Sequence, residues 1–507
     1  MKNNKLLVTF MASTMTFVLN TVINFFLTPY IVGKIGSEAY GFISLANNFT
    51  NYVQLLTIAL NSMAGRFITI SLEQGRIKEA NQYFNSVLIS NLFVTAVMLI
   101  PVMIVILCLN NIVNITPSLV SDVKLLFTFI FAAFFINLLG STFSTSTFVS
   151  NRLDINSYIS AGSYLIRLAT MVVLFAVLTP SVWIVGNANF MAAVFIIILN
   201  IVCTKKLVPQ IKLSRKYFDI KKIFVILKSG IWNTITKVGI LIADGLDLLI
   251  TNLYIDAATM GTLAIAKSIP GVITSFVGTL SSLFVPSLTI DYAHDDKEQM
   301  LININKSINF SSSIANIAYT VLIVCGFQFY SLWVPSQDAK LLQILSILTV
   351  ACNIMSGGVN CLLNMYTILN EVKKYSIVFL ITSFISIVIV FILLKTTDLG
   401  VYAIAGVSTC MSILKIVIFV IPYISVKMGY KWYKFFPIIL RNLVVVIGCI
   451  FVQLYIKSFI NINGWIELIY VGIVSIIFSA VVNGIFILGK SGTQAMISIV
   501  LTKFKKK

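Results

Sequence analysis

Apolar stretches of about 20 residues or more recur from one end of the chain to the other. A helix of about 20 residues crosses the roughly 30 Å of hydrocarbon in a bilayer. We count about fourteen such stretches and assign each of them to a membrane-spanning helix. Little chain remains between them, so the pattern predicts an all-α integral membrane protein without a soluble domain.

The pattern repeats along the chain with an offset of about 220 residues. A nearly constant offset over most of the chain is hard to obtain by chance, and it pairs Ile35 with Ile255, Gly41 with Gly261, Ala46 with Ala266, Leu60 with Leu280, Ser62 with Ser282, Ile70 with Ile290, Asn85 with Asn305, and Gly186 with Gly406. Each repeat holds six expected spans. Because six is an even number, both repeats share one orientation, and a parallel repeat of this kind places a substrate cleft between two bundles.

The repeat predicts four parts of the chain. Residues 1–203 form an N-terminal six-helix bundle, 204–224 a basic cytoplasmic connection, 225–424 a C-terminal six-helix bundle, and 425–507 two extra helices with a basic tail. The extra helices have no counterpart in the first repeat.

Composition and charge agree with a membrane protein. The chain is 58% hydrophobic and 10% charged, whereas soluble proteins are about 25% charged. The net charge of +19 does not indicate a nucleic-acid partner, because the basic residues gather in loops on one side of the expected membrane. The positive-inside rule then places both termini in the cytoplasm. One loop, DYAHDDKEQ from Asp291, is acidic on that side.

The residues needed for most catalytic chemistry are missing. His294 is the single histidine, and the cysteines lie in apolar segments without a C-x-x-C motif. No phosphate-binding loop, nucleophile elbow or dinucleotide fingerprint is present. A membrane polymerase or ligase would need catalytic residues in a large external loop, and every expected external loop is short. We therefore expect a transporter without catalytic residues, metal or cofactor.

The expected seventh span, 225–252, carries charged residues inside the membrane, where burying a charge costs free energy. On a continuous helix, Asn233, Lys237 and Asp244 share a stripe about 40° wide, with Asp247 about 60° to one side. Ionisable groups inside a membrane span indicate functional sites. The alternative is an interhelical ion pair that stabilises the C-terminal bundle.

Besides Lys415, which has no polar neighbourhood, three other cations are expected at membrane depth, Arg66, Arg167 and Lys267. If they converge with Lys237 on the cleft, the cavity is cationic and suits an anionic substrate, since arginine offers bidentate contacts to phosphate. Arg66 and Lys267 lie near helix ends, where long side chains can instead reach the interface. Arg167 is too deep for that.

The first span is neutral by contrast. Asn24 is the repeat counterpart of Asp244, and the N-terminal half has almost no membrane-buried carboxylate. One face of this span gathers the polar residues Ser13, Thr16, Asn20 and Asn24.

The junction of the first two spans carries a family resemblance. LTPYIVGKIGSEAYGFISLANNFTNYV, from Leu27, places a proline in the first span, then a short loop with glycine, then a Tyr-Gly pair that leads the second span. With Arg66, the loop SLEQGRIKEANQYF from Ser71, the two repeats and the two extra spans, this segment resembles bacterial polysaccharide transporters. The resemblance covers the whole chain. It indicates the O-antigen and capsule flippases of the multidrug/oligosaccharidyl-lipid/polysaccharide (MOP) exporter superfamily, and it implies their MATE-like fold.

This resemblance implies a function. Such a flippase moves undecaprenyl-diphosphate-linked oligosaccharide across the bacterial cytoplasmic membrane by alternating access, for capsule, exopolysaccharide or O-antigen. Implied partners are the lipid-linked anionic oligosaccharide, membrane lipids, and polysaccharide polymerase and assembly proteins. Carried onto this chain, substrate binding falls to Arg66, Arg167, Lys237 and Lys267. Coupling to a sodium ion or proton stays open, and its candidates are Asp244 and Asp247, with Asn24 as the repeat counterpart of Asp244.

Other transport functions stay open. The drug-extruding branch of the superfamily resembles a cation-coupled multidrug antiporter with a carboxylate in the first helix, where this chain has Asn20 and Asn24. Flippases for the peptidoglycan precursor or for teichoic acid are close neighbours of the polysaccharide flippases.

Overall fold

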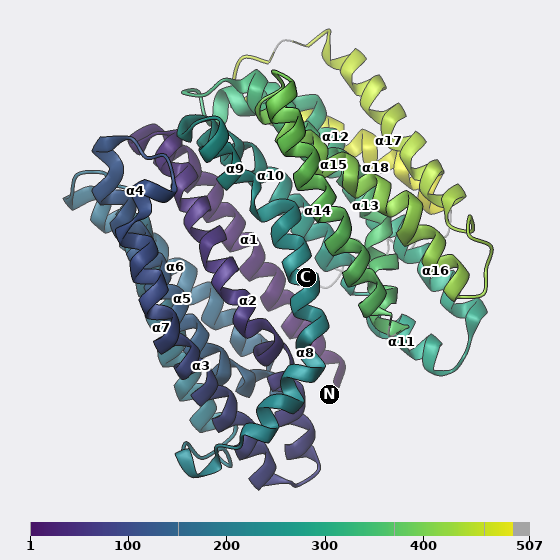
Figure 1. The fold of residues 1–507 in the computed structure, drawn as a ribbon. Coiled ribbons are helices and arrows are strands. Elements are labelled where there is room, and N and C mark those ends of the chain that lie inside the picture. Colours follow the sequence, from purple (N-terminus) through teal and green to yellow (C-terminus); the bar gives the residue numbers. More distant parts are fainter. Residues whose placement is uncertain (1, 151, 370, 461, 490–507) are drawn as a thin grey trace. The chain divides into compact units, whose positions relative to one another are not determined.

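The computed structural model consists of helices joined by short loops (Figure 1). It describes residues 2–150, 152–369, 371–460 and 462–489, without the side chains of residues 2–10, 244, 286, 293 and 356. Every regular element in these ranges is a helix, which confirms the all-α prediction. Contacts divide the chain into two compact units, Met1–Gly261 (unit 1) and Thr262–Lys507 (unit 2).

The helices of unit 1 are α1 (Lys2–Ile35), α2 (Ser37–Glu73), α3 (Ile77–Leu107), α4 (Leu109–Ile112), α5 (Val120–Val149), α6 (Leu153–Val177), α7 (Trp183–Leu207), α8 (Ile220–Ile240) and α9 (Asp247–Tyr254). α10 (Ala257–Ser282) begins in unit 1 and continues into unit 2. The further helices of unit 2 are α11 (Val285–Ala293), α12 (Lys297–Trp333), α13 (Ala339–Ile368), α14 (Val372–Thr396), α15 (Val401–Lys415), α16 (Ile421–Lys427), α17 (Phe436–Lys457) and α18 (Trp465–Asn483).

Twelve of the described helices are long and apolar enough to cross a membrane, and there are up to 13 spans if α13, bent by 56°, counts as one. This agrees with a multi-pass membrane protein of about fourteen expected spans. The seventh expected span, 225–252, is not among these helices. The α-helix is interrupted there. α8 ends at Ile240, the π-helical turn Leu241–Gly245 follows, and α9 begins at Asp247.

The interruption corrects one expectation from the sequence. A π-helix closes its hydrogen bonds over more residues than an α-helix and so changes the rotation per residue. The polar stripe calculated for a continuous helix from Asn233 to Asp244 therefore does not extend past Leu241.

The segment from α8 to α9 packs on α2 within unit 1. The sequence placed the boundary between the two bundles at residues 224 and 225, whereas the contacts place the unit boundary at Gly261. The predicted division into two bundles is based on matching the spans of one repeat to those of the other. Contacts between residues do not test that match, so the division stays a prediction.

α8 crosses α2 at a glycine. A Cβ atom on Gly230 would lie 2.1 Å from the carbonyl oxygen of Ala59, so a larger residue requires the backbone to shift. Small residues permit such close approach between membrane helices. Next to the crossing, the side-chain amide of Asn233 donates a 3.3 Å hydrogen bond to the Ser62 hydroxyl.

The backbone of the connection between α7 and α8 lies along polar side chains of α3. Asn81 Oδ1 accepts from the backbone N–H of Lys212 at 2.6 Å, and its Nδ2 donates to the carbonyl of Gln210 at 3.0 Å. One turn later, Asn85 Oδ1 accepts from the N–H of Ser214 at 2.9 Å, and its Nδ2 donates to the carbonyl of Lys212 at 2.9 Å. A side-chain amide offers both donors and an acceptor, so it can replace a backbone partner. The basic connection is therefore held against α3.

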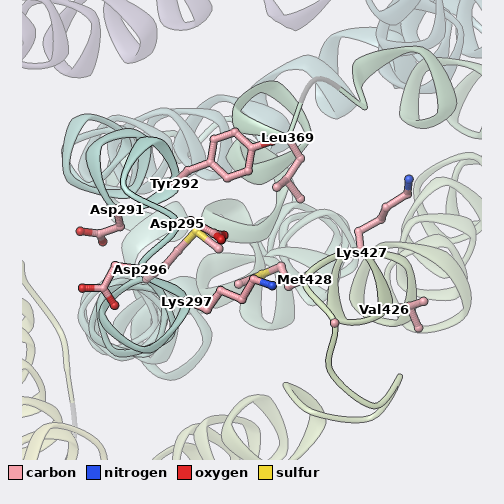
Figure 2. A pocket seen from close by; sticks show the side chains of 11 residues that line it. Asp291, Tyr292, Asp295, Asp296, Lys297, Leu369, Val426, Lys427 and Met428 are labelled. Carbon is pink, nitrogen blue, oxygen red and sulfur yellow. The ribbon is translucent and has the colours of Figure 1, made fainter.

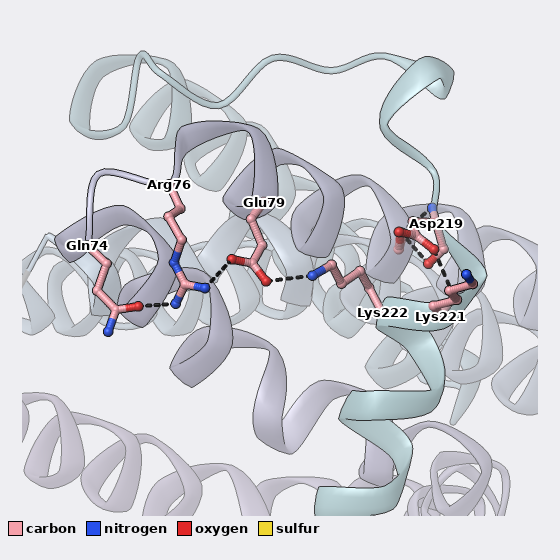
Figure 3. A network of polar contacts seen from close by, with 7 residues as sticks. Gln74, Arg76, Glu79, Asp219, Lys221 and Lys222 are labelled. Atoms are coloured by element: carbon pink, nitrogen blue, oxygen red, sulfur yellow. Dashed lines mark hydrogen bonds and ion pairs between the residues drawn. The ribbon is translucent and has the colours of Figure 1, made fainter.

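Further contacts fix the end of this connection (Figure 3). Ser86 Oγ accepts from the N–H of Asp219 at 2.8 Å. Glu79 forms ion pairs with Lys222 at 2.5 Å and with Arg76 at 2.8 Å. The carboxylate of Asp219 caps the first turn of α8. The start of α8 is thereby attached to α3.

In unit 2, the two extra helices α17 and α18 pack on α12 through buried polar contacts. The Asn316 amide donates to Asn483 Oδ1 at 3.1 Å and connects α12 to α18. Gln453 Nε2 donates to Ser479 Oγ at 2.7 Å and connects α17 to α18. Interhelical hydrogen bonds of this kind help helices to associate in lipid.

Candidate functional site

A polar cluster lies between α1 and α6. Arg167 Nη2 donates a 2.8 Å hydrogen bond to Asn24 Oδ1. The Asn24 amide in turn donates to the backbone carbonyl and to Oδ1 of Asn20, both at 2.9 Å. The structure therefore joins two candidates, Arg167 and Asn24, to which the sequence assigned separate roles.

The cluster lies about midway along the membrane helices. Arg167 is 14 residues from the start of α6 at Leu153 and 10 from its end at Val177, or about 21 and 15 Å along the helix axis. Asn24 is 13 residues after Met11 and 11 before Ile35 in the candidate span of α1. Burying a cationic side chain at this membrane depth costs free energy. The groups around Arg167 therefore determine how its charge is stabilised.

No carboxylate compensates the charge of Arg167 among the side chains that the structure describes. Its Nε is buried and makes no hydrogen bond with described residues. A guanidinium carries five N–H donors, and Asn24 takes one of them. Guanidinium donors match the geometry of an oxyanion such as a phosphate.

The polar face of α1 continues as a contact with α6. Ser13 Oγ lies 2.9 Å from Ser157 Oγ, and Thr16 Oγ1 donates to the carbonyl of Ser157 at 3.0 Å. The face that the sequence picked out by its polarity is therefore the face that packs on the helix of Arg167.

Side chains of α2 form hydrogen bonds with the π-helical turn. The carbonyl oxygen of Gly245 accepts hydrogen bonds from the Tyr52 hydroxyl at 2.6 Å and from Asn48 Nδ2 at 3.0 Å. Single π-helical turns inside membrane helices are frequent at functional sites. Asn48 and Tyr52 were not among the residues predicted from the sequence, although two polar residues four positions apart in an apolar span are a readable signal.

The C-terminal end of the same segment is also attached within unit 1. Asn252 Oδ1 accepts from the backbone N–H of Asn114 at 2.8 Å, and its Nδ2 donates to the carbonyl of Asn114 at 3.0 Å. The segment is thus fixed at the Gly230 crossing, at Gly245 and at Asn252.

The charged residues of this segment have different surroundings. Asp247 is buried, with 4% of its surface exposed, at the first position of α9. Lys237 is half-buried and makes no hydrogen bond or ion pair with any described residue. The side chain of Asp244 lies outside the described residues, so no partner can be assigned to it.

The four candidate cations lie on four helices. Arg66 is exposed on α2, Arg167 lies on α6 and Lys237 on α8, all in unit 1, while Lys267 is half-buried on α10 in unit 2. Their convergence on one cleft stays a prediction.

The acidic loop that departs from the charge rule lines a cavity of about 200 Å³ in unit 2 (Figure 2). Asp291, Asp295, Asp296 and Lys427 are part of its wall. Asp296 accepts from the backbone N–H of Gln299 at 2.9 Å and so caps α12, and Asp291 accepts from Asn303 Nδ2 at 2.6 Å. Two of the acidic residues therefore have structural roles, which explains their presence without a ligand.

No group of three or more His, Cys, Asp or Glu side chains within the described ranges could hold a metal ion. Arg167, which is cationic, and its amide partner Asn24 likewise favour an anion over a metal ion.

Comparison with known proteins gives three results. The family model described as "Polysaccharide biosynthesis protein" matches residues 5–290. The uncharacterized membrane protein EpsK of Bacillus subtilis (strain 168) is 28% identical over 502 residues, which cover 99% of this chain and 98% of EpsK. Two solved structures have a similar fold, each with a TM-score of 0.64.

The first of these structures is a multidrug resistance MATE family transporter of the MOP superfamily in its inward-facing conformation, 11% identical, with 83% of this chain and 98% of that chain covered. The second is the lipid II flippase MurJ in an inward closed conformation, 14% identical, with 94% of this chain and 98% of that chain covered. Identities this low concern the fold alone, and they confirm the expected MATE-like fold.

Proposed function

Because this chain belongs to the polysaccharide biosynthesis protein family, we propose that it is a flippase for undecaprenyl-diphosphate-linked oligosaccharide repeat units. It moves them from the inner to the outer leaflet of the bacterial cytoplasmic membrane by alternating access, and it serves the synthesis of capsule, exopolysaccharide or O-antigen. Both termini lie in the cytoplasm. The family and the MOP-type fold support a transporter of this class, and the substrate is the proposed part.

The proposal rests mainly on the position and the hydrogen-bond partners of Arg167. A guanidinium sits midway along a membrane helix, bonded to a neutral amide and to no described carboxylate. An uncompensated cation at that depth is expensive to maintain. A diphosphate passing through the protein supplies the missing negative charge, and arginine matches its oxygen geometry.

Other residues complete the proposed mechanism. Arg66, Lys237 and Lys267 are the further cations that bind the diphosphate and the sugars in this mechanism. Asp244 and Asp247 couple a sodium ion or proton, since the π-helical turn between α8 and α9 places them where the segment departs from regular helix. Polysaccharide polymerase and assembly proteins receive the product.

Two alternatives use the same fold. A multidrug antiporter binds cations, and the neutral Asn20 and Asn24 beside Arg167 disfavour a cationic ligand. A flippase for a peptidoglycan or teichoic-acid precursor shares the polyprenyl diphosphate class of substrate, so only the affected polymer separates it from the proposed function.

The test compares cells that lack the gene with cells that regain it as wild type, as Arg167→Ala, or as Arg152→Ala. Arg152 is a matched control at the inner end of the same helix, where it pairs with Asp154 at 3.0 Å. We expect lost surface polysaccharide in the deletion strain and in Arg167→Ala at normal protein level, with susceptibility to cationic drugs unchanged. Intact polymer together with increased drug susceptibility would instead identify an antiporter.

A further inference from the structure

Asn24 fixes the orientation of Arg167 through a directional chain of hydrogen bonds. Its Nδ2 has two acceptors, the backbone carbonyl and Oδ1 of Asn20, each at 2.9 Å. Its Oδ1 is thereby turned toward Arg167 Nη2 at 2.8 Å. A flipped amide would place NH₂ against the guanidinium and lose all three bonds. Asn24 is therefore positioned as an acceptor for the arginine.

The neutrality of this acceptor has an electrostatic consequence. An amide oxygen holds the guanidinium in place without cancelling its charge, whereas a carboxylate at the same distance would form an ion pair in a low-dielectric environment. The Nε of Arg167 is buried and has no partner in the described structure, so at least this donor is not used by the protein.

We propose that Asn24 is a positioning residue that determines specificity, because its neutral amide keeps the charge of Arg167 available to an anionic lipid diphosphate. This inference rests on the proposed function and deepens it. It assigns Asn24 to the anion site instead of to ion coupling, since both ends of its side chain are engaged with Asn20 and Arg167.

The critical variant is Asn24→Asp, which keeps the size of the side chain and adds a negative charge beside Arg167. The carboxylate competes with the ligand for the guanidinium, so binding of an anion falls. Asn24→Ala removes the positioning contact but leaves the charge of Arg167 uncompensated, so its binding falls less. A merely structural role for Asn24 predicts that binding follows thermal stability in both variants.

Binding is measured on the purified full-length chain in lipid nanodiscs, with geranylgeranyl diphosphate as the probe and a thermal unfolding curve for every variant. Asn110→Asp is the control for net charge, since Asn110 is exposed on α4 in the same unit. Asn20→Asp places the carboxylate one helical turn before Asn24, at the residue that is linked to Arg167 through Asn24, and serves as a second variant should Asn24→Asp fail to fold.

We expect Asn24→Asp to weaken binding about tenfold or more, corresponding to about 1.4 kcal/mol, while its thermal midpoint stays at or above that of Asn24→Ala. Asn20→Asp should weaken binding less, and Asn110→Asp should bind like wild type. The inference is overturned if wild type binds the probe and Asn24→Asp binds equally well, or if binding and stability fall in parallel. Failure of wild type itself to bind would contradict the proposed function, and the inference with it.

Discussion

Tyr52 donates a 2.6 Å hydrogen bond to the carbonyl oxygen of Gly245, and so attaches α2 to the π-helical turn between α8 and α9. A π-helical turn leaves backbone groups outside the regular α-helical pattern, and in a membrane each such group needs a partner. Tyr52 and Asn48 supply that partner from the neighbouring helix. The charged seventh segment is therefore interrupted at a defined place and stabilised there.

We expect Tyr52→Phe to lower the free energy of unfolding by about 1 kcal/mol, because one hydrogen bond is lost while Asn48 still pairs the carbonyl. Combined with Asn48→Leu, the carbonyl loses both side-chain donors and the loss should reach about 2–3 kcal/mol. Thermal unfolding in detergent measures both. Tyr158→Phe, at an exposed position of α6, is the control and should leave stability unchanged. Equal curves for all variants would mean that these bonds do not stabilise the turn.

The close crossing of α8 and α2 predicts that position 230 tolerates no side chain larger than that of glycine. Gly230→Ala places a methyl group 2.1 Å from the carbonyl oxygen of Ala59, so the helices must separate. Overpacking of this kind costs about 1–3 kcal/mol. Gly33→Ala, in α1, meets no atom within 4 Å and is the matched control. The yield of folded protein and its thermal midpoint should fall for Gly230→Ala only, and an unchanged midpoint would refute the close contact.

The asparagine contacts of the connection predict position-specific hydrogen exchange. Asn81→Leu removes the acceptor of the Lys212 amide, and Asn85→Leu removes the acceptor of the Ser214 amide. Each amide should exchange about tenfold faster in its own variant, the factor that corresponds to about 1.4 kcal/mol of lost protection. The two variants control each other, because each leaves the other acceptor in place. Equal rates in both variants would show that the connection is not held by these side chains.

A pH dependence is expected from Glu371, which lies between α13 and α14. The Lys427 ammonium, 2.5 Å away, and the Tyr423 hydroxyl, 2.8 Å away, hold the pKa of this carboxyl below its usual value of 4.5. A lowered folded pKa means that the stabilising contribution is present above about pH 4.5 and is lost as the pH falls through the folded value. The difference in thermal midpoint between wild type and Glu371→Gln should therefore shrink on acidification. A constant difference would contradict this.

Much of the fold could be predicted from periodicity, because a span of apolar residues has few structural options in lipid. The helix ends near Ile35 and Val177 follow from this. The break at Leu241–Gly245 could not be predicted, because the apolar pattern runs through it. The side chains bonded to its Gly245 carbonyl, Tyr52 and Asn48, lie almost 200 residues away in the sequence.

The residues of the candidate site could be predicted from the sequence, but the hydrogen bonds between them could not. The depth of Arg167 and the polar face of α1 are readable from the sequence. That Arg167 bonds to Asn24 is not, because helical periodicity gives the face of each helix and not the neighbour that it meets. The assignment of Asn24 to ion coupling rests on its repeat partner Asp244 and stays a prediction.

The most direct test of the account is lipid flipping by the reconstituted chain. Proteoliposomes carry wild type, Arg167→Ala or Arg152→Ala, together with a fluorescent undecaprenyl-diphosphate oligosaccharide whose exposure at the outer surface is followed over time. We expect flipping by wild type and by Arg152→Ala, and a rate at least about tenfold lower for Arg167→Ala, equivalent to about 1.4 kcal/mol in the barrier. Equal rates for wild type and Arg167→Ala would contradict it.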